Sequence, residues 1–382
     1  MNNFEFQNPV KLIFGQGQIA RLPEQIAKGT KIMLTYGGGS IFKNGVYDQV
    51  KDALIGYDVI EFGGIEANPD YATLIKAIGI CKETKVDMLL AVGGGSVIDG
   101  TKFIATGALY DGDPWEFMLN PALIGPSLPL ATVLTLPATG SEMNNGAVIS
   151  RRERNEKFAF MSPYNYPLFS ILDPTVIYSL PQRQVANGIV DTYAHTLEQY
   201  LTTDINTYVM DRWAEGLLQT LIEIAPQLMK NQENYDLCAN FMLTATMALN
   251  GFIAMGVDQD WTTHMIGHEL TALHGLDHGV TLAIVYPGVM DVLRNEKRTK
   301  LLQYAERVWD VREGSEDERI NAAIRKTEEF FRSLGIRTRL SEHHIGEETI
   351  HTIVGRFKQR GWKLGEAGVT PDKVEEILKK VK

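Results

Sequence analysis

Cysteine is scarce in this chain of 382 residues. Only Cys81 and Cys238 occur, and neither belongs to a Cys-x-x-Cys pair. Two isolated cysteines favour a reducing compartment, so we expect a cytoplasmic protein. Long apolar runs are also missing. An uncharged and mainly apolar stretch, residues 241–257, contains threonines, an asparagine and two glycines. It is too short and too polar to span a bilayer, so we expect a buried helix there and no membrane association.

Positive charge is not in excess. The chain has 37 Lys and Arg against 47 Asp and Glu, a formal net charge of −10, which argues against a nucleic-acid partner. The first residues, MNNFEFQNPVK, lack a basic region followed by an apolar run, so no secretory signal is expected. The length fits about two domains, and 44% hydrophobic residues are ordinary for a globular protein.

The first half of the chain alternates strand and helix patterns. Apolar runs predict strands at 8–14, 31–36, 58–62, 88–92, 130–134 and 169–172. Helical spacing covers 71–84, and the capping-box spacing of Ser96 and Asp99 predicts another helix start. The alternation indicates a doubly wound α/β domain with a mostly parallel sheet, and we place it at residues 1–179.

Beyond Leu180-Pro181 the pattern contains no convincing strand. Helices are expected at 182–201, 209–229, 235–251, 262–273, 298–310, 317–334 and 348–360. A last helix should begin with Thr370 as cap and Pro371 in its first turn. Residues 180–382 are therefore predicted to form an all-helical domain.

Histidine is sparse except in one segment. Residues 261–279, WTTHMIGHELTALHGLDHG, contain four of the eight histidines. Upstream, Asp191 and His195 are four residues apart and share a helix face. On one straight helix His264 and His278 would be roughly 20 Å apart, but Gly275 offers a break that lets the chain turn back. Asp191, His195, His264 and His278 are predicted to form one divalent-metal site.

The donor set limits the choice of metal. Three imidazoles and one carboxylate suit Zn²⁺ or Fe²⁺ better than Ca²⁺ or Mg²⁺. The alternative is that these are ordinary helical histidines without a ligand. The His-Glu-x-x-His protease motif is absent, because Ala272 stands where its second histidine is required. His343, His344 and His351 are expected to be surface residues.

Two identical segments, Gly37-Gly38-Gly39-Ser40 and Gly93-Gly94-Gly95-Ser96, each follow an apolar strand. Such loops let backbone N–H groups approach phosphate, and two of them favour a dinucleotide. The alternative is a tight turn without a ligand. The first loop is followed by Lys43, with no acidic residue before Asp48, which favours NADP(H) over NAD(H).

A third polar loop, TLPATGSE at 135–142, also follows a strand. Thr135, Thr139 and Ser141 can donate to a cofactor or substrate, or merely cap the next segment. Lys157 follows a basic run and can reach a cofactor ribose, although a solvated hairpin charge is the simpler interpretation.

These motifs together resemble the iron-containing (group III) alcohol dehydrogenases, and within them the NADPH-dependent aldehyde reductase or butanol dehydrogenase branch. The resemblance runs along nearly the whole chain, through KLIFGQG, LTYGGGS, GGGSVIDGTKF, TLPATGSE, DTYAHTLEQY and MIGHELTALHGLDHG. It implies a fold like that of dehydroquinate synthase, with Asp191, His195, His264 and His278 as ligands of iron or zinc. It implies His268 as a proton carrier near the nicotinamide.

The resemblance also implies a set of cofactor contacts. We expect them at Gly37, Gly38, Gly39, Ser40, Asn68, Gly94, Gly95, Ser96, Asp99, Thr135, Thr139, Ser141, Lys157, Tyr178 and Leu180. Several NAD-using relatives have Asp at the place of Gly39, and that departure supports NADPH. Members of the family are generally dimers or larger, so a homodimer is expected.

The expected reaction is reversible reduction of small aldehydes to primary alcohols, in a cleft between the two domains. Phe252, Met255, Trp261 and His274 are expected to line it, which favours apolar substrates. A lyase resembling dehydroquinate synthase would need a basic cluster that the metal motifs lack. A metallohydrolase would leave the glycine loops unexplained, and a binding protein with a stabilising metal would show no redox turnover.

Overall fold

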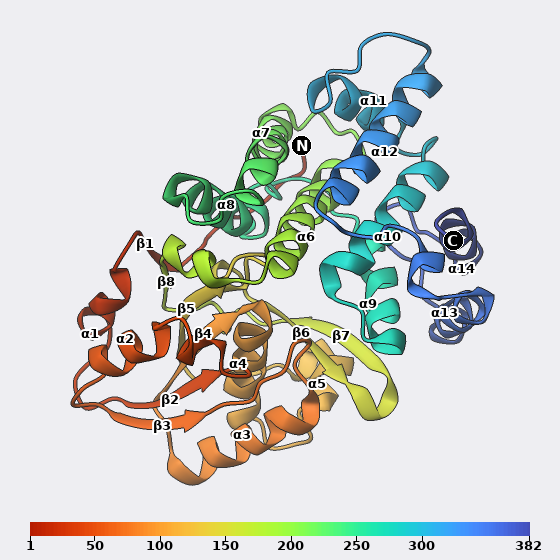
Figure 1. The fold of residues 1–382 in the computed structure, drawn as a ribbon. Coiled ribbons are helices and arrows are strands. Elements are labelled where there is room, and N and C mark those ends of the chain that lie inside the picture. The colour runs from red at the N-terminus through yellow and green to blue at the C-terminus, as the bar shows by residue number, and fades with distance from the viewer. The chain divides into compact units, whose positions relative to one another are not determined.

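The computed structural model describes all 382 residues and divides into two compact units. The α/β unit consists of Gln7–Pro181 and Gln232–Asn250. The helical unit consists of Met1–Phe6, Gln182–Asn231 and Gly251–Lys382. Figure 1 shows the chain coloured along its length, with the sheet in red to yellow and most of the helical unit in green to blue.

The α/β unit is built on a six-stranded parallel sheet in the order β1-β8-β5-β4-β2-β3. Its strands are β1 (Lys11–Phe14), β2 (Lys31–Tyr36), β3 (Asp58–Phe62), β4 (Met88–Gly94), β5 (Leu130–Leu136) and β8 (Phe169–Leu172). The central strands β4 and β5 are buried along nearly their whole length, as continuous apolar runs require when helices cover both faces. The doubly wound parallel sheet predicted from the sequence is confirmed.

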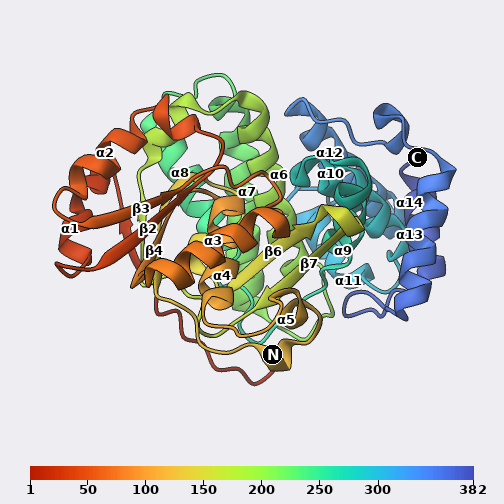
Figure 2. The same ribbon diagram turned by 90° about the horizontal axis from the view of Figure 1, so that it is seen from below.

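The helices of this unit are α1 (Leu22–Gln25), α2 (Val46–Ala53), α3 (Tyr71–Thr84), α4 (Gly95–Ala108), α5 (Trp115–Leu119) and α8 (Tyr235–Ala248). Figure 2 shows α3 and α4 side by side. Short 3-10 helices include η2 (Ser40–Phe42), η4 (Ser141–Met143) and η6 (Pro174–Ser179). The predicted capping box is wrong: α4 starts at Gly95, and no side chain caps it. The Asp99 carboxylate accepts from the Ser141 hydroxyl and the Val148 N–H instead.

A two-stranded antiparallel hairpin, β6 (Gly146–Arg151) and β7 (Glu156–Met161), was not among the predicted strands. It packs beside α4 (Figure 2). Lys157 lies on β7 with only 6% of its surface exposed, so the solvated interpretation of this lysine is wrong.

The helical unit contains α6 (Gln182–Tyr200), α7 (Tyr208–Leu228), α9 (Thr262–His274), α10 (His278–Val292), α11 (Arg298–Arg307), α12 (Glu316–Ser333), α13 (Glu347–Arg360) and α14 (Pro371–Lys380). No strand occurs after residue 180, as expected, and Thr370 caps α14. Helix α10, which packs against α6, α9, α12 and α14 (Figure 1), was not predicted from the sequence. This helix is apolar on nearly all sides and contains Pro287, so it lacks the amphipathic period that identifies a surface helix.

The predicted boundary at residue 180 separates the two units except for two segments. Met1–Phe6 joins the helical unit, and Gln232–Asn250, with α8, joins the α/β unit. Contacts inside the α/β unit explain the second segment, since the Thr246 hydroxyl donates to the Glu142 carboxylate at 2.6 Å and α8 packs on η6. None of the helices has both the length and the apolar character needed to cross a bilayer.

Candidate metal centre and glycine loops

Helix α6 supplies two of the four predicted metal ligands. Asp191 and His195 lie one turn apart on one face of this helix, with 3% and 4% of their surfaces exposed. A carboxylate buried this deeply is stable only when groups around it compensate its charge. The four-residue spacing in the sequence was enough to predict that these two side chains share one helix face.

The other two ligands come from α9 and α10. His264 stands in the first turn of α9, and His278 is the first residue of α10. Between them Gly275 ends α9 with a left-handed φ of 67°, a conformation that favours glycine. The chain reverses there, so two histidines fourteen residues apart come together, and the predicted break at Gly275 is confirmed.

The four side chains converge on one point. Their ligand atoms lie within 4.8 Å of one another. The Nε2 atoms of His195, His278 and His264 lie 3.5, 3.6 and 3.9 Å from the same oxygen, Asp191 Oδ1. Donor atoms bound tetrahedrally at the usual zinc distances would be about 3.4 Å apart. The arrangement therefore fits a divalent cation with little adjustment.

The surroundings of this cluster are closed on one side and open on the other. His264 is 5% exposed, whereas the side chain of His278 retains 23% of its exposure. The rings of His195 and His264 stack at 4.7 Å, and Trp261 lies edge-on to His264 at 5.1 Å. Trp261 adopts a left-handed φ of 68°, which is rare for an aromatic residue and is a form of strain that clusters at functional sites.

Sequence reasoning missed one residue of this centre, Glu198. It lies on α6 seven residues after Asp191 and three after His195, and it is completely buried. Its Oε1 is 3.1 Å from His264 Nδ1 and accepts from the His264 backbone N–H. Burial raises the pKa of Glu198 well above its usual value, and neighbouring Asp260 raises it further. The i, i+4, i+7 spacing of Asp191, His195 and Glu198 was the available signal.

His268 lies one turn after His264 on α9, and its ring centroid is 5.4 Å from that of His278. It is therefore adjacent to the candidate metal centre. His274, expected to line the substrate site, ends α9, and its Nε2 lies 2.9 Å from the Thr349 hydroxyl. Burial lowers the pKa of His274.

The second glycine loop joins β4 directly to α4. Gly94 ends the strand and Gly95 begins the helix, so free backbone N–H groups of the first turn point outward at the carboxyl end of the sheet. A side chain at Gly94 would lie 2.9 Å from Leu136 Cβ, and one at Gly95 would collide with Thr139. Only glycine fits at these two positions, because the 135–142 loop packs directly against the second glycine loop. Thr139 therefore lies in contact with Gly95.

Two further predicted cofactor residues, Asn68 and Lys157, lie next to Ser96 of this loop. The Ser96 hydroxyl accepts from the Asn68 N–H at 3.2 Å, and Lys157 Nζ donates to Asn68 Oδ1 at 2.8 Å. Asn68 has a φ of 54°, again in the left-handed region. Segments from three separate parts of the chain thus place polar side chains at one end of the sheet.

Asp99 and Ser141 use their side chains inside the α/β unit. Ser141 donates to Asp99 at 2.6 Å and accepts from Lys102 Nζ, which has no exposed surface. Lys102 also donates to the Ser141 and Gly146 carbonyls. Burial lowers the pKa of Lys102 to about 8 and raises that of Asp99. This network anchors the 135–142 loop, and direct contact of Asp99 or Ser141 with a cofactor stays a prediction.

The first glycine loop is less tightly enclosed. Gly38 has open space where a side chain would point, and Gly39 has a left-handed φ of 97°. Ser40 then starts η2, which leads to Lys43. Among the remaining predicted contacts, Thr135 is buried in β5, while Tyr178 and Leu180 lie in and just after η6. Their cofactor roles stay predictions.

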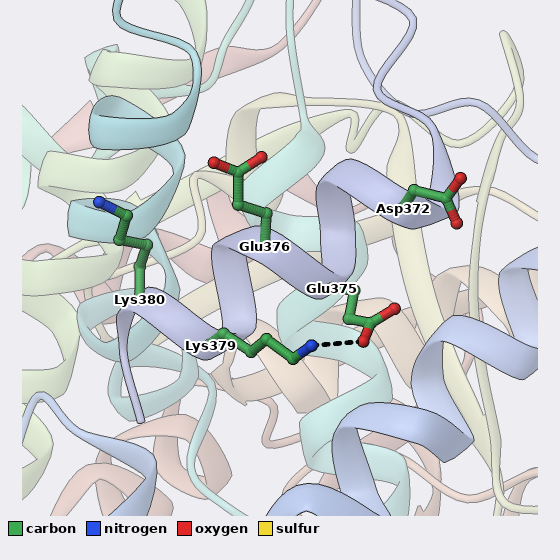
Figure 3. Close-up of a pocket in the computed structure, with 5 residues that line it drawn as sticks. All are labelled: Asp372, Glu375, Glu376, Lys379 and Lys380. Atoms are coloured by element: carbon green, nitrogen blue, oxygen red, sulfur yellow. Dashed lines mark hydrogen bonds and ion pairs between the residues drawn. The ribbon is translucent and has the colours of Figure 1, made fainter.

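A surface hollow of about 430 Å³ lies along α14, away from every predicted site residue in sequence. Figure 3 shows its lining, which consists of Asp372, Glu375, Glu376, Lys379 and Lys380. Glu375 and Lys379 pair across one helical turn at 2.6 Å. Acids early and lysines late in a helix complement its dipole and pair along its surface, which accounts for this charge pattern without a ligand.

Comparison with known proteins identifies the family of this chain. The family model described as iron-containing alcohol dehydrogenase matches residues 9–174, and the C-terminal model of the same family matches residues 185–381. The NADPH-dependent aldehyde reductase YqhD of Escherichia coli K12 is 54% identical over 96% of this chain and 96% of its own. A probable NADH-dependent butanol dehydrogenase 1 of Bacillus subtilis is 45% identical over 99% of both chains.

Solved structures show the same fold. The crystal structure of E. coli K-12 YqhD superposes with a TM-score of 0.98 at 52% identity, covering 100% of this chain and 99% of that one. The NADH-dependent butanol dehydrogenase A of Thermotoga maritima superposes with a TM-score of 0.96 at 37% identity, with the same coverage.

Proposed function

Because the chain belongs to the iron-containing alcohol dehydrogenase family, we propose that it is a metal-dependent, NADP(H)-linked aldehyde reductase that interconverts small aldehydes and primary alcohols such as butanal and butanol. The single observation that carries this proposal is the convergence of Asp191, His195, His264 and His278 within 4.8 Å. It brings together the same four residues that the family resemblance implies as ligands.

The donor set defines the chemistry available. When bound, a divalent cation in this cluster supplies Lewis-acid polarisation of the substrate carbonyl, and a reduced nicotinamide supplies the hydride. Three neutral imidazoles and one carboxylate suit iron or zinc, and metal analysis of the purified protein decides between them. The partly exposed His278 marks the open side of the cluster.

The neighbouring side chains provide the remaining steps. His268 lies beside His278, and we propose that its imidazole donates the proton that the product oxygen takes up. Trp261 lies against His195 and His264 and offers an apolar ring beside the cluster. That ring favours small apolar aldehydes over phosphorylated substrates.

NADP(H) is the proposed cofactor because of the first glycine loop. A loop with Gly39, Ser40 and Lys43 presents no carboxylate to repel a 2′-phosphate. The relatives use both cofactors, since YqhD is described as NADPH-dependent and the B. subtilis protein as NADH-dependent. Initial rates with each cofactor in turn measure the preference, and faster turnover with NADH at equal concentration would contradict it.

The decisive experiment is NADPH oxidation by butanal, measured spectrophotometrically on protein of known metal content. His264→Ala removes one of four ligands and should lower the rate roughly a thousandfold or more, since Lewis-acid stabilisation is worth several kcal/mol. His351→Ala, which changes an exposed histidine on α13, is the matched control and should leave the rate unchanged.

Two results would remove the proposal. One is full activity of His264→Ala in a metal-free preparation. The other is a parent protein that binds metal and NADPH yet oxidises no NADPH with any aldehyde, which would favour a lyase or a metal-stabilised binding protein.

The proposal includes a homodimer in the cytoplasm, with no nucleic-acid or membrane partner. The helical unit exposes large apolar side chains at Phe4 and Tyr208, and Trp213 stacks on Phe252 at 4.2 Å while remaining 38% exposed. Exposed apolar patches are typical of association surfaces, and we take these side chains to form part of one. Sedimentation analysis tests this, and a monomer at micromolar concentration would contradict it.

A further inference from the structure

Glu198 lies at the inner end of the candidate metal centre. It shares one stripe of α6 with Asp191 and His195, so a single helix face delivers two ligands and this carboxylate. It has no exposed surface. A completely buried carboxylate needs hydrogen-bond donors, and those available to it come from the start of α9.

The contact with the His264 ring is the informative one. Glu198 Oε1 lies 3.1 Å from Nδ1, while Nε2 of the same ring faces Asp191 on the opposite side. The same Glu198 oxygen already accepts the His264 backbone N–H, so it faces the ring as an acceptor and keeps the proton on Nδ1. The Nε2 lone pair is then directed at the cluster, and the ring becomes a better donor.

Glu198 also has a structural task. The first N–H groups of α9 lack helical partners, and its N-cap residue, Trp261, makes no side-chain cap. Glu198 accepts the His264 N–H at 3.1 Å, and its backbone carbonyl accepts from Asp260 at 2.9 Å. A test must therefore separate two effects of Glu198: its hydrogen bond to the backbone at the start of α9, and its contact with the His264 ring.

We propose that Glu198 is a positioning residue for the metal: through its hydrogen bond to Nδ1 it fixes the tautomer of His264 and strengthens the bond that Nε2 makes to a divalent cation. This inference rests on the proposed function in so far as it takes the cluster to be a metal site. It adds a residue outside the four ligands, and it concerns metal affinity rather than turnover.

The test is zinc affinity of the metal-stripped, full-length protein, measured by competition with a chromophoric chelator. Glu198→Gln preserves shape and can still accept a backbone N–H, but its neutral amide holds the ring less strongly. The dissociation constant for Zn²⁺ should rise about 10- to 100-fold. The absorption spectrum of the Co²⁺-substituted variant should shift as well, because the geometry of one ligand changes.

Glu215→Gln is the matched control. Glu215 is a glutamate of the same unit with 3% exposure, bonded to Tyr200 and Arg307 rather than to a candidate ligand. The Glu215→Gln variant also changes one buried glutamate to glutamine, but its dissociation constant for Zn²⁺ should stay within about twofold of the parent value. Thermal unfolding of the stripped proteins reports how far each change disturbs the fold.

The inference is overturned if Glu198→Gln holds Zn²⁺ within threefold of the parent, or if both variants lose affinity equally. Should Glu198→Gln fail to fold, Glu198→Asp keeps the charge but withdraws it from the ring, and it should show the same loss; parent-like affinity would again overturn the inference. A parent that binds Zn²⁺ but reduces no aldehyde defeats only the proposed function.

Discussion

The two glycine loops have the same four residues but different surroundings. The first, Gly37–Ser40, ends in a 3-10 helix and leaves open space around Gly38. The second, Gly93–Ser96, runs straight into α4, and a side chain at Gly93 would lie 2.5 Å from Val97 Cβ. Identical sequence therefore yields one loop that is partly open and one that is enclosed by packing.

The difference follows from what lies beneath each loop. Beside the second, four acceptors on Ser141, Asn144 and Gly146 lie within hydrogen-bond distance of the Lys102 ammonium, which joins α4 to the end of the 135–142 loop and the start of β6. The first loop has no such anchor on η2, and Phe42 beside it is 49% exposed. The comparison teaches that a glycine motif acquires its rigidity from the segments that pack on it.

Lys102→Met should have the largest effect, because it removes the anchor that distinguishes the second loop. Loss of one partner from a buried charge network destabilises by about 3–5 kcal/mol. Chemical denaturation of parent and variant at neutral pH measures this. A loss below 1 kcal/mol would show that the second loop does not depend on Lys102.

The difference in stability between the parent protein and Lys102→Met should also depend on pH. Burial lowers the pKa of Lys102 in the folded protein to about 8, from 10.5 unfolded. Between these values the unfolded chain binds more protons, so the contribution of Lys102 to stability increases as pH rises from 8. The stability difference between parent and variant should therefore widen from pH 8 to pH 10, by about 2 kcal/mol. A difference that narrows would contradict the sign.

Gly95→Ala should have the next largest effect. The added Cβ collides with Thr139, and overpacking typically costs about 1–3 kcal/mol. NADPH affinity should fall at the same time, because the added side chain forces the second glycine loop away from the 135–142 loop. Thermal unfolding and fluorescence titration with NADPH measure the two effects, and an unchanged NADPH affinity would remove this loop from the cofactor site.

Gly39→Asp should act on cofactor choice more than on stability. The left-handed φ of 97° and the nearby Phe42 ring make a side chain cost about 1–2 kcal/mol. The new carboxylate repels a 2′-phosphate and can bind a ribose diol, so the ratio of NADPH to NADH efficiency should fall at least about tenfold. Gly39→Asn, with the same shape and no charge, is the control and should change the ratio much less.

Gly38→Ala should have the smallest effect on folding. Nothing lies within 4 Å of the added Cβ, so stability should change by less than about 0.5 kcal/mol. NADPH binding should nevertheless weaken if the pyrophosphate approaches this backbone as expected. Parent-like NADPH affinity would exclude Gly38 from the cofactor contacts and reduce the first loop to a turn.

Local pattern was sufficient for much of the α/β unit. All six sheet strands were predicted, and the central strands β4 and β5 were the clearest because strands buried on both faces are apolar throughout. The same logic failed for α10, where an apolar helix shows no period and Pro287 argues against helix. The β6–β7 hairpin was missed because its charged run, Arg151 to Arg154, resembles an exposed loop.

At the candidate metal centre, spacing predicted pairs but not their surroundings. Asp191 and His195 follow from helical geometry, and Gly275 was correctly expected to turn the chain. Glu198 was missed because its partner, His264, is 66 residues away. The capping interpretation of Ser96 and Asp99 failed because Asp99 bonds to the distant Val148 N–H.

The sequence by itself determined the elements, the alternation that makes a parallel sheet, and the residue types able to bind a cation or a phosphate, since these depend on neighbours along the chain. The tertiary structure decided which identical glycine loop is enclosed, which charged side chains are buried, and which carboxylate supports a ligand. Those outcomes depend on contacts between segments far apart in sequence, where desolvation makes one well-placed hydrogen bond decisive.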